Sequence, residues 1–359
     1  MKKVYIIAEI GVNHNGNFLL AKKLIKEAKK SGADAAKFQI FVPEKVVSEK
    51  TVLASYQKRK GIANQLDLIK KLTLSKSEFL KLQIYCVKLK IDFLASVFDL
   101  ESLNFAVNNL KLKQIKIASG EITNFQHLHK AAEYGVNIIL STGASSLTEI
   151  ERALSVILSG YNNEKIRSKT SYRRFIHYSK KRKMLEEKVT LLHCVSSYPV
   201  PDNQLNLNGI KTIRSRFKLK TGYSDHSTGT LPAVIAVGLG AEVIEKHLTL
   251  DNDLIGPDHK ASLNPVNFRE MVLQIRLAEK MLGNGEKIPQ NCEIQNLKVI
   301  RRSLVTSEDV SAKTKVTWKN IESIRLTGGI PSEELINIIG KRFKRSIKKG
   351  EQIYLSDLN

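Results

Sequence analysis

The chain has 359 residues, 42% of them hydrophobic and 26% charged, which fits a barrel-sized domain with a small appendage and excludes a fibre, a disordered tail or a small disulfide-stapled scaffold. Its 58 lysines and arginines against 35 aspartates and glutamates give a net charge of +23, which suits anionic partners of several classes. The longest apolar runs are shorter than the roughly 20 residues that a transmembrane helix needs, so no membrane partner is expected.

The cysteines and the motifs exclude further classes of protein. The three cysteines, Cys86, Cys194 and Cys292, are far apart and odd in number, so neither a disulfide framework nor a thiolate zinc site is expected. A reducing, cytoplasmic location is the simplest one. No recognition helix, zinc finger or stacking-aromatic motif accompanies the positive charge, and we therefore expect no nucleic-acid partner.

Residues 1–283 alternate short β-rich apolar runs with amphipathic helical patterns, as parallel α/β folds do. The predicted strands are residues 4–8, 33–39, 92–96, 114–118, 137–141, 189–194, 220–223 and 243–247. The predicted helices are residues 17–31, 75–90, 100–109, 124–133, 147–159, 205–216, 230–239 and 265–283. Because eight βα units over about 280 residues match the usual barrel length, the pattern predicts a (β/α)8 TIM barrel rather than an open doubly wound sheet.

Two segments interrupt this alternation, residues 41–73 after the second strand and the basic insertion 160–187 before the sixth. The first is a long βα loop, the kind that usually carries function in a barrel, whereas the second has no predicted role. Beyond the barrel, residues 284–298 are expected to be a linker and residues 299–359 a small β-rich domain without a long helix.

Polar residues gather where the predicted strands end. In a parallel barrel these ends converge on one mouth, so their side chains are candidates for function. The set comprises Glu9, Lys37, Gln39, Ser96, Lys116, Ser119, Glu121, Ser141, Thr142, Ser196, Ser224, Asp225, His226, Glu245, Lys246 and His247. Ammonium groups, hydroxyls and loop amides together make a cradle for phosphate or carboxylate.

Each of these signals also has a structural interpretation. Lys37 and Lys116 have apolar neighbours and need an anionic partner, which a salt bridge to Glu9 or Glu121 could supply. Two such lysines nevertheless favour an anionic ligand. For His226 and His247 two interpretations have equal support: hydrogen-bonded core residues, or ligands of a divalent metal.

Several motifs, in this order, resemble the sialic acid synthase family. They are Ala8 to Gly16 (AEIGVNHNG), Lys37-Phe38-Gln39, Ser119 to Asn124 (SGEITN), Ser141-Thr142-Gly143, Tyr223 to His226 (YSDH), Glu245-Lys246-His247 and Gly256 to Lys260 (GPDHK). The C-terminal Arg302-Ser303-Leu304 and Gly328-Gly329-Ile330-Pro331 resemble the antifreeze-like SAF domain that ends these synthases. The resemblance covers nearly the whole chain and implies the TIM barrel followed by the SAF domain.

The family resemblance also implies a role for each matching residue. His226 and His247 match the metal-binding histidines, which usually serve Mn²⁺, with Mg²⁺ or Co²⁺ as alternatives. The phosphate and carboxylate of phosphoenolpyruvate are expected on Lys37, Ser96, Lys116, Ser119, Ser141, Ser196 and Ser224. The sugar and the catalytic water are expected on Glu9, Gln39, Tyr198, Asp258 and Glu121, with Glu9 the first choice of catalytic carboxylate and Glu121 and Asp258 the reserves. Arg325 matches an arginine that reaches the N-acetyl group in the partner subunit of a domain-swapped homodimer.

The chain departs from the family pattern at four places. Ala95-Ser96-Val97 replaces Ser-Thr-Pro, Ala144 replaces a methionine, and Arg325-Leu326-Thr327 replaces Arg-Pro-Gly. Ser197 stands where close relatives often carry glutamate, a change that could shift sugar specificity.

The function that the resemblance implies is N-acetylneuraminate (sialic acid) synthase. Such an enzyme condenses phosphoenolpyruvate with N-acetylmannosamine and water to a nine-carbon 2-keto acid and phosphate, with C–O cleavage and a metal ion. The alternative is legionaminic acid synthase, which uses 2,4-diacetamido-2,4,6-trideoxymannose. Two other classes stay open: a Schiff-base aldolase with Lys116 or Lys37 as nucleophile, and a non-enzymatic basic binding protein.

Overall fold

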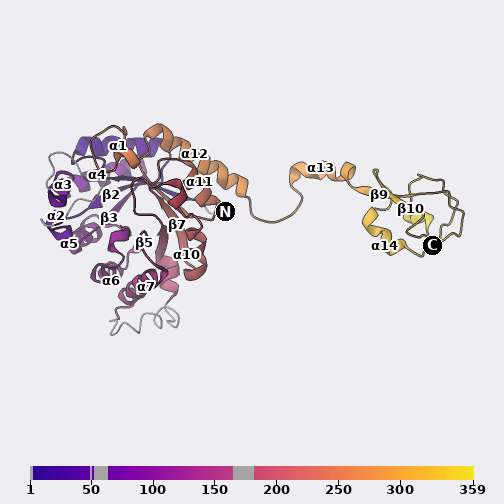
Figure 1. Cartoon of the computed structure of the whole chain (residues 1–359), viewed down its shortest axis with the longest axis horizontal. Coiled ribbons are helices and arrows are strands. Elements are labelled where there is room, and N and C mark those ends of the chain that lie inside the picture. The colour runs from indigo at the N-terminus through magenta and orange to yellow at the C-terminus, as the bar shows by residue number, and fades with distance from the viewer. Residues whose placement is uncertain (1–2, 49–50, 52–63, 165–181) are drawn as a thin grey trace. The chain divides into compact units, whose positions relative to one another are not determined.

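The computed structural model describes residues 3–48, 51, 64–164 and 182–359 (Figure 1). The chain divides into two compact units, Met1–Asn284 and Gly285–Asn359, which are described separately below. Most of the basic insertion 160–187 and part of the segment 41–73 lie outside the described residues.

Eight parallel strands close into a barrel in the first unit, in the order in which they occur along the chain, β1 to β8. They are β1 (Tyr5–Gly11), β2 (Ala35–Ile40), β3 (Asp92–Val97), β4 (Gln114–Ile117), β5 (Asn137–Ser141), β6 (Val189–His193), β7 (Lys220–Asp225) and β8 (Val243–His247). Closure is completed by β8 pairing with β1, where Glu9 lies beside His247. The TIM barrel that the strand pattern predicts is therefore confirmed.

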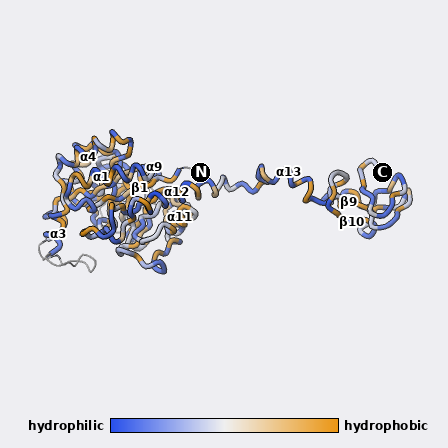
Figure 2. The backbone as a smooth tube through the Cα atoms, turned by 90° about the horizontal axis from the view of Figure 1, so that it is seen from above, coloured by the Kyte–Doolittle hydropathy of each residue, from blue (hydrophilic) through white to orange (hydrophobic). Residues whose placement is uncertain are grey.

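Helices follow the strands and surround the barrel (Figure 1). The long ones are α1 (Phe18–Lys30), α4 (Lys76–Leu89), α6 (Phe125–Glu133), α7 (Leu147–Tyr161), α10 (Gly209–Phe217), α11 (Leu231–Gly238) and α12 (Pro265–Leu282). Shorter ones are α2 (Pro43–Val46), α3 (Gln65–Lys71), α5 (Leu100–Asn104) and α9 (Lys183–Lys188). Figure 2 shows hydrophobic and hydrophilic residues alternating along α1, α4 and α12, as in helices with one face on a core.

Local sequence explains where several helices begin. Ser75 caps α4 and Ser146 caps α7, and in each case the glutamate three residues on completes a capping box. Asn17 caps α1 and Asn124 caps α6 by accepting a hydrogen bond from a backbone N–H.

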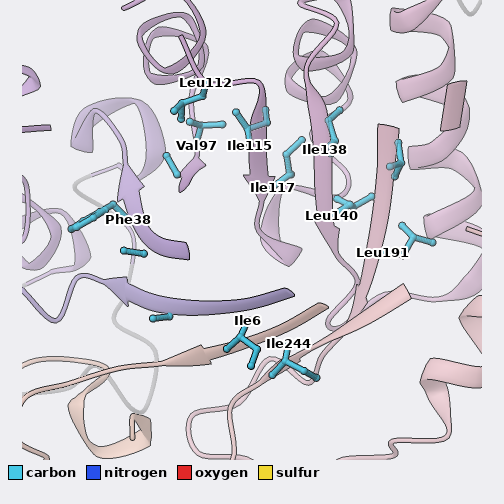
Figure 3. Close-up of a cluster of buried hydrophobic side chains, with 14 of the residues drawn as sticks. Ile6, Phe38, Val97, Leu112, Ile115, Ile117, Ile138, Leu140, Leu191 and Ile244 are labelled. Carbon is cyan, nitrogen blue, oxygen red and sulfur yellow. The ribbon is translucent and has the colours of Figure 1, made fainter. Parts of the chain in front are cut away.

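Alternation along the strands separates two layers of core. Side chains such as Ile6, Phe38 and Ile244 pack between the strands and the helices (Figure 3). The intervening residues form a second cluster inside the barrel, made of Ile7, Ala35, Leu94, Ile139, Leu192 and Val243. Because side chains repeat with a period of two, the residue two positions after each inner apolar residue also points inward, nearer the mouth.

The structure differs from the sequence prediction in three local features. The second half of the predicted helix 100–109 is a π-helix, Phe105–Asn109, which continues directly from α5. The helix predicted from residue 205 begins at Gly209, after a short 3₁₀ turn, Asp202–Gln204. Residues 284–298, expected as a linker, contain most of helix α13 (Asn291–Ile300), which a capping box of Gln290 and Glu293 starts.

The second unit contains a two-stranded antiparallel sheet of β9 (Arg302–Thr306) and β10 (Ile321–Arg325), together with α14 (Leu335–Ile338). Isolated bridges join Val305 to Gln352 and Val310 to Ile347. Its own small core includes Leu304, Val316, Ile321, Phe343 and Ile353. Among the described residues of both units, no helix has the length and hydropathy of a membrane span.

Candidate active site

Polar residues lie directly above the inner apolar layer of the barrel. Ile7 is followed two residues later by Glu9, Ala35 by Lys37, and Ile139 by Ser141. In the same way Leu94 precedes Ser96, and Val243 precedes Glu245 and then His247. The alternation of these five strands, β1, β2, β3, β5 and β8, therefore delivers a polar side chain to the mouth.

Two adjoining cavities occupy the mouth. The deep one, about 60 Å³, is lined by Glu9, Lys37, Gln39, Ser96, Phe98, Lys116, Ala118, Ser119, Ser141, Cys194, Tyr198, Ser224, His226, Glu245 and His247. The wider one, about 580 Å³, shares Gln39, Phe98, Ala118, Ser119, Tyr198 and His247 with it and adds Ser196 and Asp258. Most of the sequence-predicted residues therefore gather in one site, and those that line neither cavity are Glu121, Thr142, Asp225, Lys246 and Arg325.

Two lysines and two glutamates form a buried charged cluster at the bottom of the deep cavity. Lys37 Nζ lies 2.6 Å from Glu9 Oε2 and 3.6 Å from Glu245 Oε2, and Lys116 Nζ lies 3.6 Å from Glu245 Oε1. Each of the four side chains is at most 4% exposed. Such buried charges persist only when they are paired, so Glu245 is the anion that both lysines share.

Burial and pairing shift the pKa values of this cluster in different directions. Burial raises the pKa of the Glu9 carboxyl, although Lys37 opposes the shift. Burial also works against the charge on Lys37, but Glu245 and Glu9 outweigh it and raise the pKa of Lys37. The pKa of Lys116 is lowered by burial, and Glu245 offsets only part of the effect. The pKa of Glu245 falls to about 2 because Lys116 and Lys37 outweigh its burial.

Hydroxyl groups line the wall beside the lysines. Lys37 Nζ donates a 2.8 Å hydrogen bond to Ser96 Oγ, and Ser224 Oγ donates a 2.7 Å bond to Glu245 Oε1. The Ser119 and Ser196 hydroxyls lie 3.0 Å apart. A Cβ on Gly143 would fall between these two serines, so the absence of a side chain at Gly143 keeps the space open.

The two histidines face each other at the cavity wall, with ring centroids 5.6 Å apart. His226 Nδ1 donates to the Val195 carbonyl at 2.7 Å, which leaves a lone pair on Nε2, where the Tyr198 hydroxyl donates at 3.1 Å. Burial lowers the pKa of His226 to about 4 and that of His247 well below its ordinary value. Both rings are therefore neutral, the form in which histidine binds metal ions.

Two neutral imidazoles near a carboxylate are a partial donor set, of residue types that bind divalent cations. His247 Nδ1 is buried, has no hydrogen-bond partner among the residues that the structure describes, and lies 3.6 Å from Asp258 Oδ2. The carbonyl partner of His226 Nδ1 is the kind of contact that orients metal-binding histidines. Within the described part of the chain, no group of three His, Cys, Asp or Glu residues is placed to hold a metal, so other ligands would have to complete the shell.

Two residues to which the family resemblance gives a role, Glu121 and Arg325, lie outside both cavities, and Glu245 is a site residue for which no role is predicted. Glu121 lines neither cavity, and its carboxylate accepts a hydrogen bond from Asn124 Nδ2 at 2.8 Å. Arg325 is exposed in the second unit, at the end of β10. Glu245 is among the strand-end residues and in the motif Glu245-Lys246-His247, but the sequence predicts no individual role for it. Its spacing of two residues before His247 places it inside the barrel and could have identified it as the partner of the lysines.

The arrangement can hold an anion with two separated charged groups and can transfer a proton. Two ammonium groups and several hydroxyls face the deep cavity, and Glu9 is a buried carboxylate whose Oε1 accepts from Gln39 Nε2 at 2.9 Å. A carboxyl group with a raised pKa is suited to general acid–base work near neutral pH. The wider cavity has room for a second, larger substrate beside these groups.

Comparisons with known proteins agree over almost the whole chain. The family model described as "NeuB family" matches residues 24–287, and the SAF domain model matches residues 301–359. The chain is 41% identical to the N,N'-diacetyllegionaminic acid synthase of Campylobacter jejuni, over 98% of this chain and 99% of that one. It is 37% identical to the synthase of the same name from Legionella pneumophila, with 96% and 92% covered.

A solved structure supports the same grouping. The N-acetylneuraminic acid synthetase of Leptospira borgpetersenii, determined in complex with citrate, superposes with a TM-score of 0.69 at 34% identity. The match covers 82% of this chain and 90% of that one.

Proposed function

Because the chain belongs to the NeuB family and ends in a SAF domain, we propose that it condenses phosphoenolpyruvate with an N-acetylated mannosamine-type sugar and water. The products are a nine-carbon 2-keto acid and inorganic phosphate. The observation that carries the proposal is the buried cluster of Lys37, Lys116, Glu9 and Glu245 at the barrel mouth, beside a wider cavity. The relatives named above are synthases of this class.

The lysines and serines hold phosphoenolpyruvate. Its phosphate and carboxylate are anionic, and Lys37 and Lys116 offer the two buried ammonium groups of the deep cavity. Ser96, Ser119, Ser141 and Ser196 supply hydroxyl donors along the cavity walls. Fixing both anionic ends orients C3 of phosphoenolpyruvate toward the wider cavity, which turns a bimolecular encounter into a positioned one.

The bond changes in the reaction identify where a carboxylate is needed. The C2=C3 π electrons of phosphoenolpyruvate form a bond from C3 to the aldehyde carbon of the open-chain sugar, whose oxygen gains a proton, and C2 is left electron-deficient. A water oxygen adds to C2 and loses one proton. The C2–O bond to phosphate then breaks, and the remaining hydroxyl proton is lost with the departing phosphate as the C2 ketone forms. Glu9 is the carboxylate that we assign to take the proton from that water, because it is buried in the deep cavity with a raised pKa. Asp258, in the wider cavity, is the reserve, whereas Glu121 lines neither cavity.

His226 and His247 would hold a divalent cation, for which Mn²⁺ is our first choice. Such an ion, when bound, acts as a Lewis acid on the aldehyde oxygen. The chain itself prepares this position by keeping both imidazoles neutral and by fixing the His226 ring through the Val195 carbonyl.

The walls of the wider cavity bear on the choice of sugar. Its apolar lining residues are Val12, Phe41, Val46, Val47, Leu68, Ile69, Leu72, Phe98 and Ile122, many of them on α3 or in the loops that follow β1 to β3. A sugar hydroxyl buried against such a wall without a partner is disfavoured, whereas a methyl group is not. Together with the names of the 41% and 37% identical relatives, this favours 2,4-diacetamido-2,4,6-trideoxymannose and a legionaminic acid product over N-acetylmannosamine.

The proposal extends to assembly and location. We infer a domain-swapped homodimer in which Arg325 of one subunit serves the sugar bound by the other. The cysteines agree with a cytoplasmic enzyme, since all three are free and Cys86 and Cys194 are buried.

The test is phosphate release from phosphoenolpyruvate with each of the two sugars, in Mn²⁺ and in EDTA, followed by the product mass. We expect release that requires sugar, stops in EDTA and returns with Mn²⁺. No release with either sugar from a folded protein would overturn the proposal. Because the pKa of Lys116 is lowered, a borohydride arm with pyruvate tests the Schiff-base alternative, and covalent trapping with full activity in EDTA would favour it.

A further inference from the structure

A second buried ion pair lies just outside the deep cavity, between the ends of β7 and β8. Lys246 Nζ lies 2.8 Å from Asp225 Oδ2, and both side chains are completely buried. Neither residue lines the cavities, although their neighbours Ser224, His226, Glu245 and His247 all do. Strand alternation explains the difference, because Asp225 and Lys246 point away from the barrel interior where the flanking residues point into it.

The pair is fully hydrogen-bonded within the described residues. Lys246 Nζ also donates to the Ser227 carbonyl at 2.6 Å and to Ser227 Oγ at 3.2 Å. The other carboxylate oxygen, Asp225 Oδ1, accepts from Ser227 N at 2.8 Å and from the Tyr223 hydroxyl at 3.2 Å. The ammonium group and the carboxylate thus have several partners each, and the geometry is fixed from several directions.

The residues that make these contacts are sequence neighbours of His226 and His247. Asp225 and Ser227 stand on either side of His226, and Lys246 immediately precedes His247. Asp225 and Lys246 are also register partners in the β7–β8 ladder. The cluster of Asp225, Ser227 and Lys246 therefore ties the backbone on both sides of one histidine to the backbone beside the other.

We propose that Lys246 and Asp225 are positioning residues that set the distance and orientation of His226 and His247 for a divalent cation. The inference rests on the assignment of the two histidines as metal ligands in the proposed function. A buried ion pair is a weak source of stability, since apolar residues of similar size often replace one without loss. Lys246 and Asp225 instead make directional hydrogen bonds, to each other and to Ser227, which an apolar pair could not make. Contacts of this kind, one step removed from the ligands, typically change metal affinity by about 10- to 100-fold.

The experiment is Mn²⁺ binding to the full-length protein, measured as free Mn²⁺ by electron paramagnetic resonance without substrate. The main variant is the double substitution Lys246→Met and Asp225→Asn, which removes both charges and leaves none unpaired. We expect its Kd for Mn²⁺ to rise about tenfold or more. The milder variant Ser227→Ala removes only the hydroxyl contact, and we expect a smaller rise in the same direction.

A matched control separates positioning from general loss of stability. Glu151, which is buried and paired with Arg216 Nη2 at 2.9 Å, belongs to α7 and lines neither cavity. Glu151→Gln should lower the Tm without changing the Kd for Mn²⁺. If the double variant folds, unchanged Mn²⁺ affinity in both that variant and Ser227→Ala would overturn the inference. If the double variant does not fold, unchanged Mn²⁺ affinity in Ser227→Ala would overturn it. Absence of Mn²⁺ binding by the unmodified protein would instead overturn the metal assignment itself.

Discussion

Replacing Gly143 by alanine should weaken the binding of phosphoenolpyruvate. A Cβ at this position would overlap Ser196 Oγ, and it would lie 2.8 Å from Cys194 Sγ and 3.2 Å from Ser119 Oγ. Real Cβ atoms essentially never lie within 3.0 Å of such neighbours, so Ser196 Oγ and Cys194 Sγ would have to move, and Ser119 Oγ would have to shift by a few tenths of an ångström. The backbone of Gly143 is ordinary, since it is not among the glycines with positive φ, and alanine therefore adds no conformational strain.

The size of the effect follows from the overlap. A hydrogen bond to a charged group contributes about 1.5–3 kcal/mol, so turning a serine hydroxyl away from phosphoenolpyruvate should cost about 10- to 150-fold in affinity. Because Ser119 and Ser196 are assigned to phosphoenolpyruvate, the loss should fall on the KM for phosphoenolpyruvate, with the KM for the sugar changed much less. The assay is initial-rate phosphate release at varied phosphoenolpyruvate and saturating sugar.

Gly120 provides the matched control. It lines the same wider cavity, but a Cβ there would meet nothing within 4 Å. Gly120→Ala should leave the KM for phosphoenolpyruvate unchanged within about twofold. If Gly143→Ala behaves like Gly120→Ala, the serines do not hold phosphoenolpyruvate and the assignment of the cradle is wrong.

Three further predictions concern the site and the stability of the barrel. Lys37→Met removes the cation that Glu9 and Glu245 share, so the KM for phosphoenolpyruvate should rise at least about 30-fold. A rise below about threefold would refute the role of Lys37 in anion binding. Ile69→Asn places an amide on the apolar wall and should reduce the kcat/KM preference for the 2,4-diacetamido sugar about tenfold, whereas Ile84→Asn on the exposed face of α4 should not. Burial lowers the pKa of His14 from 6.5 to about 4, so the unfolded chain takes up the proton first as the pH falls. The stability that neutral His14 contributes is complete above pH 6.5 and should fall by about 3 kcal/mol toward pH 4. Urea unfolding of the native chain and of His14→Asn at pH 7.5 and 4.5 measures this, and an equal loss in both would contradict it.

The strands and their polar ends could be predicted because one periodicity determines both. Residues such as Ile7 and Glu9 follow each other at a spacing of two, and the same spacing that fills the inner apolar layer delivers the polar layer. The polar residues that meet at the barrel mouth can therefore be predicted from the sequence, although the barrel has eight separate strands. The predicted positions of His226 and His247 at neighbouring strand ends are an example.

Pairings between strands could not be predicted in the same way. The predicted partners of the buried lysines are Glu9 or Glu121, and the salt bridge of Glu9 with Lys37 is confirmed at 2.6 Å. Glu245, which no local pattern identifies as a partner, lies within 3.6 Å of both lysines. Glu121 instead lies in the 3₁₀ turn Ser119–Glu121 just after β4, where its carboxylate turns to Asn124. Such choices depend on the closure of the barrel, which joins β8 to β1, and no local pattern contains that information.

Helix α13 was not expected because its local signals are weak. The segment Asn291–Ile300 has no buried residues and only modest amphipathicity, so it lacks the apolar stripe by which helices are recognised. Its capping box, Gln290 with Glu293, is a variant with glutamine as the cap, which the usual serine or threonine pattern does not include.

The charged cluster of the deep cavity has a consequence for the order in which ligands associate. Lys37 and Lys116 are balanced by Glu9 and Glu245, so the cavity is close to electrical neutrality before any substrate arrives. A trianion entering this space brings excess negative charge, which a divalent cation at the neighbouring histidines would offset. Each ligand should therefore increase the affinity for the other by the same factor, as thermodynamic reciprocity requires. The enzyme would then accumulate as a ternary complex rather than as either binary one, ready for the sugar.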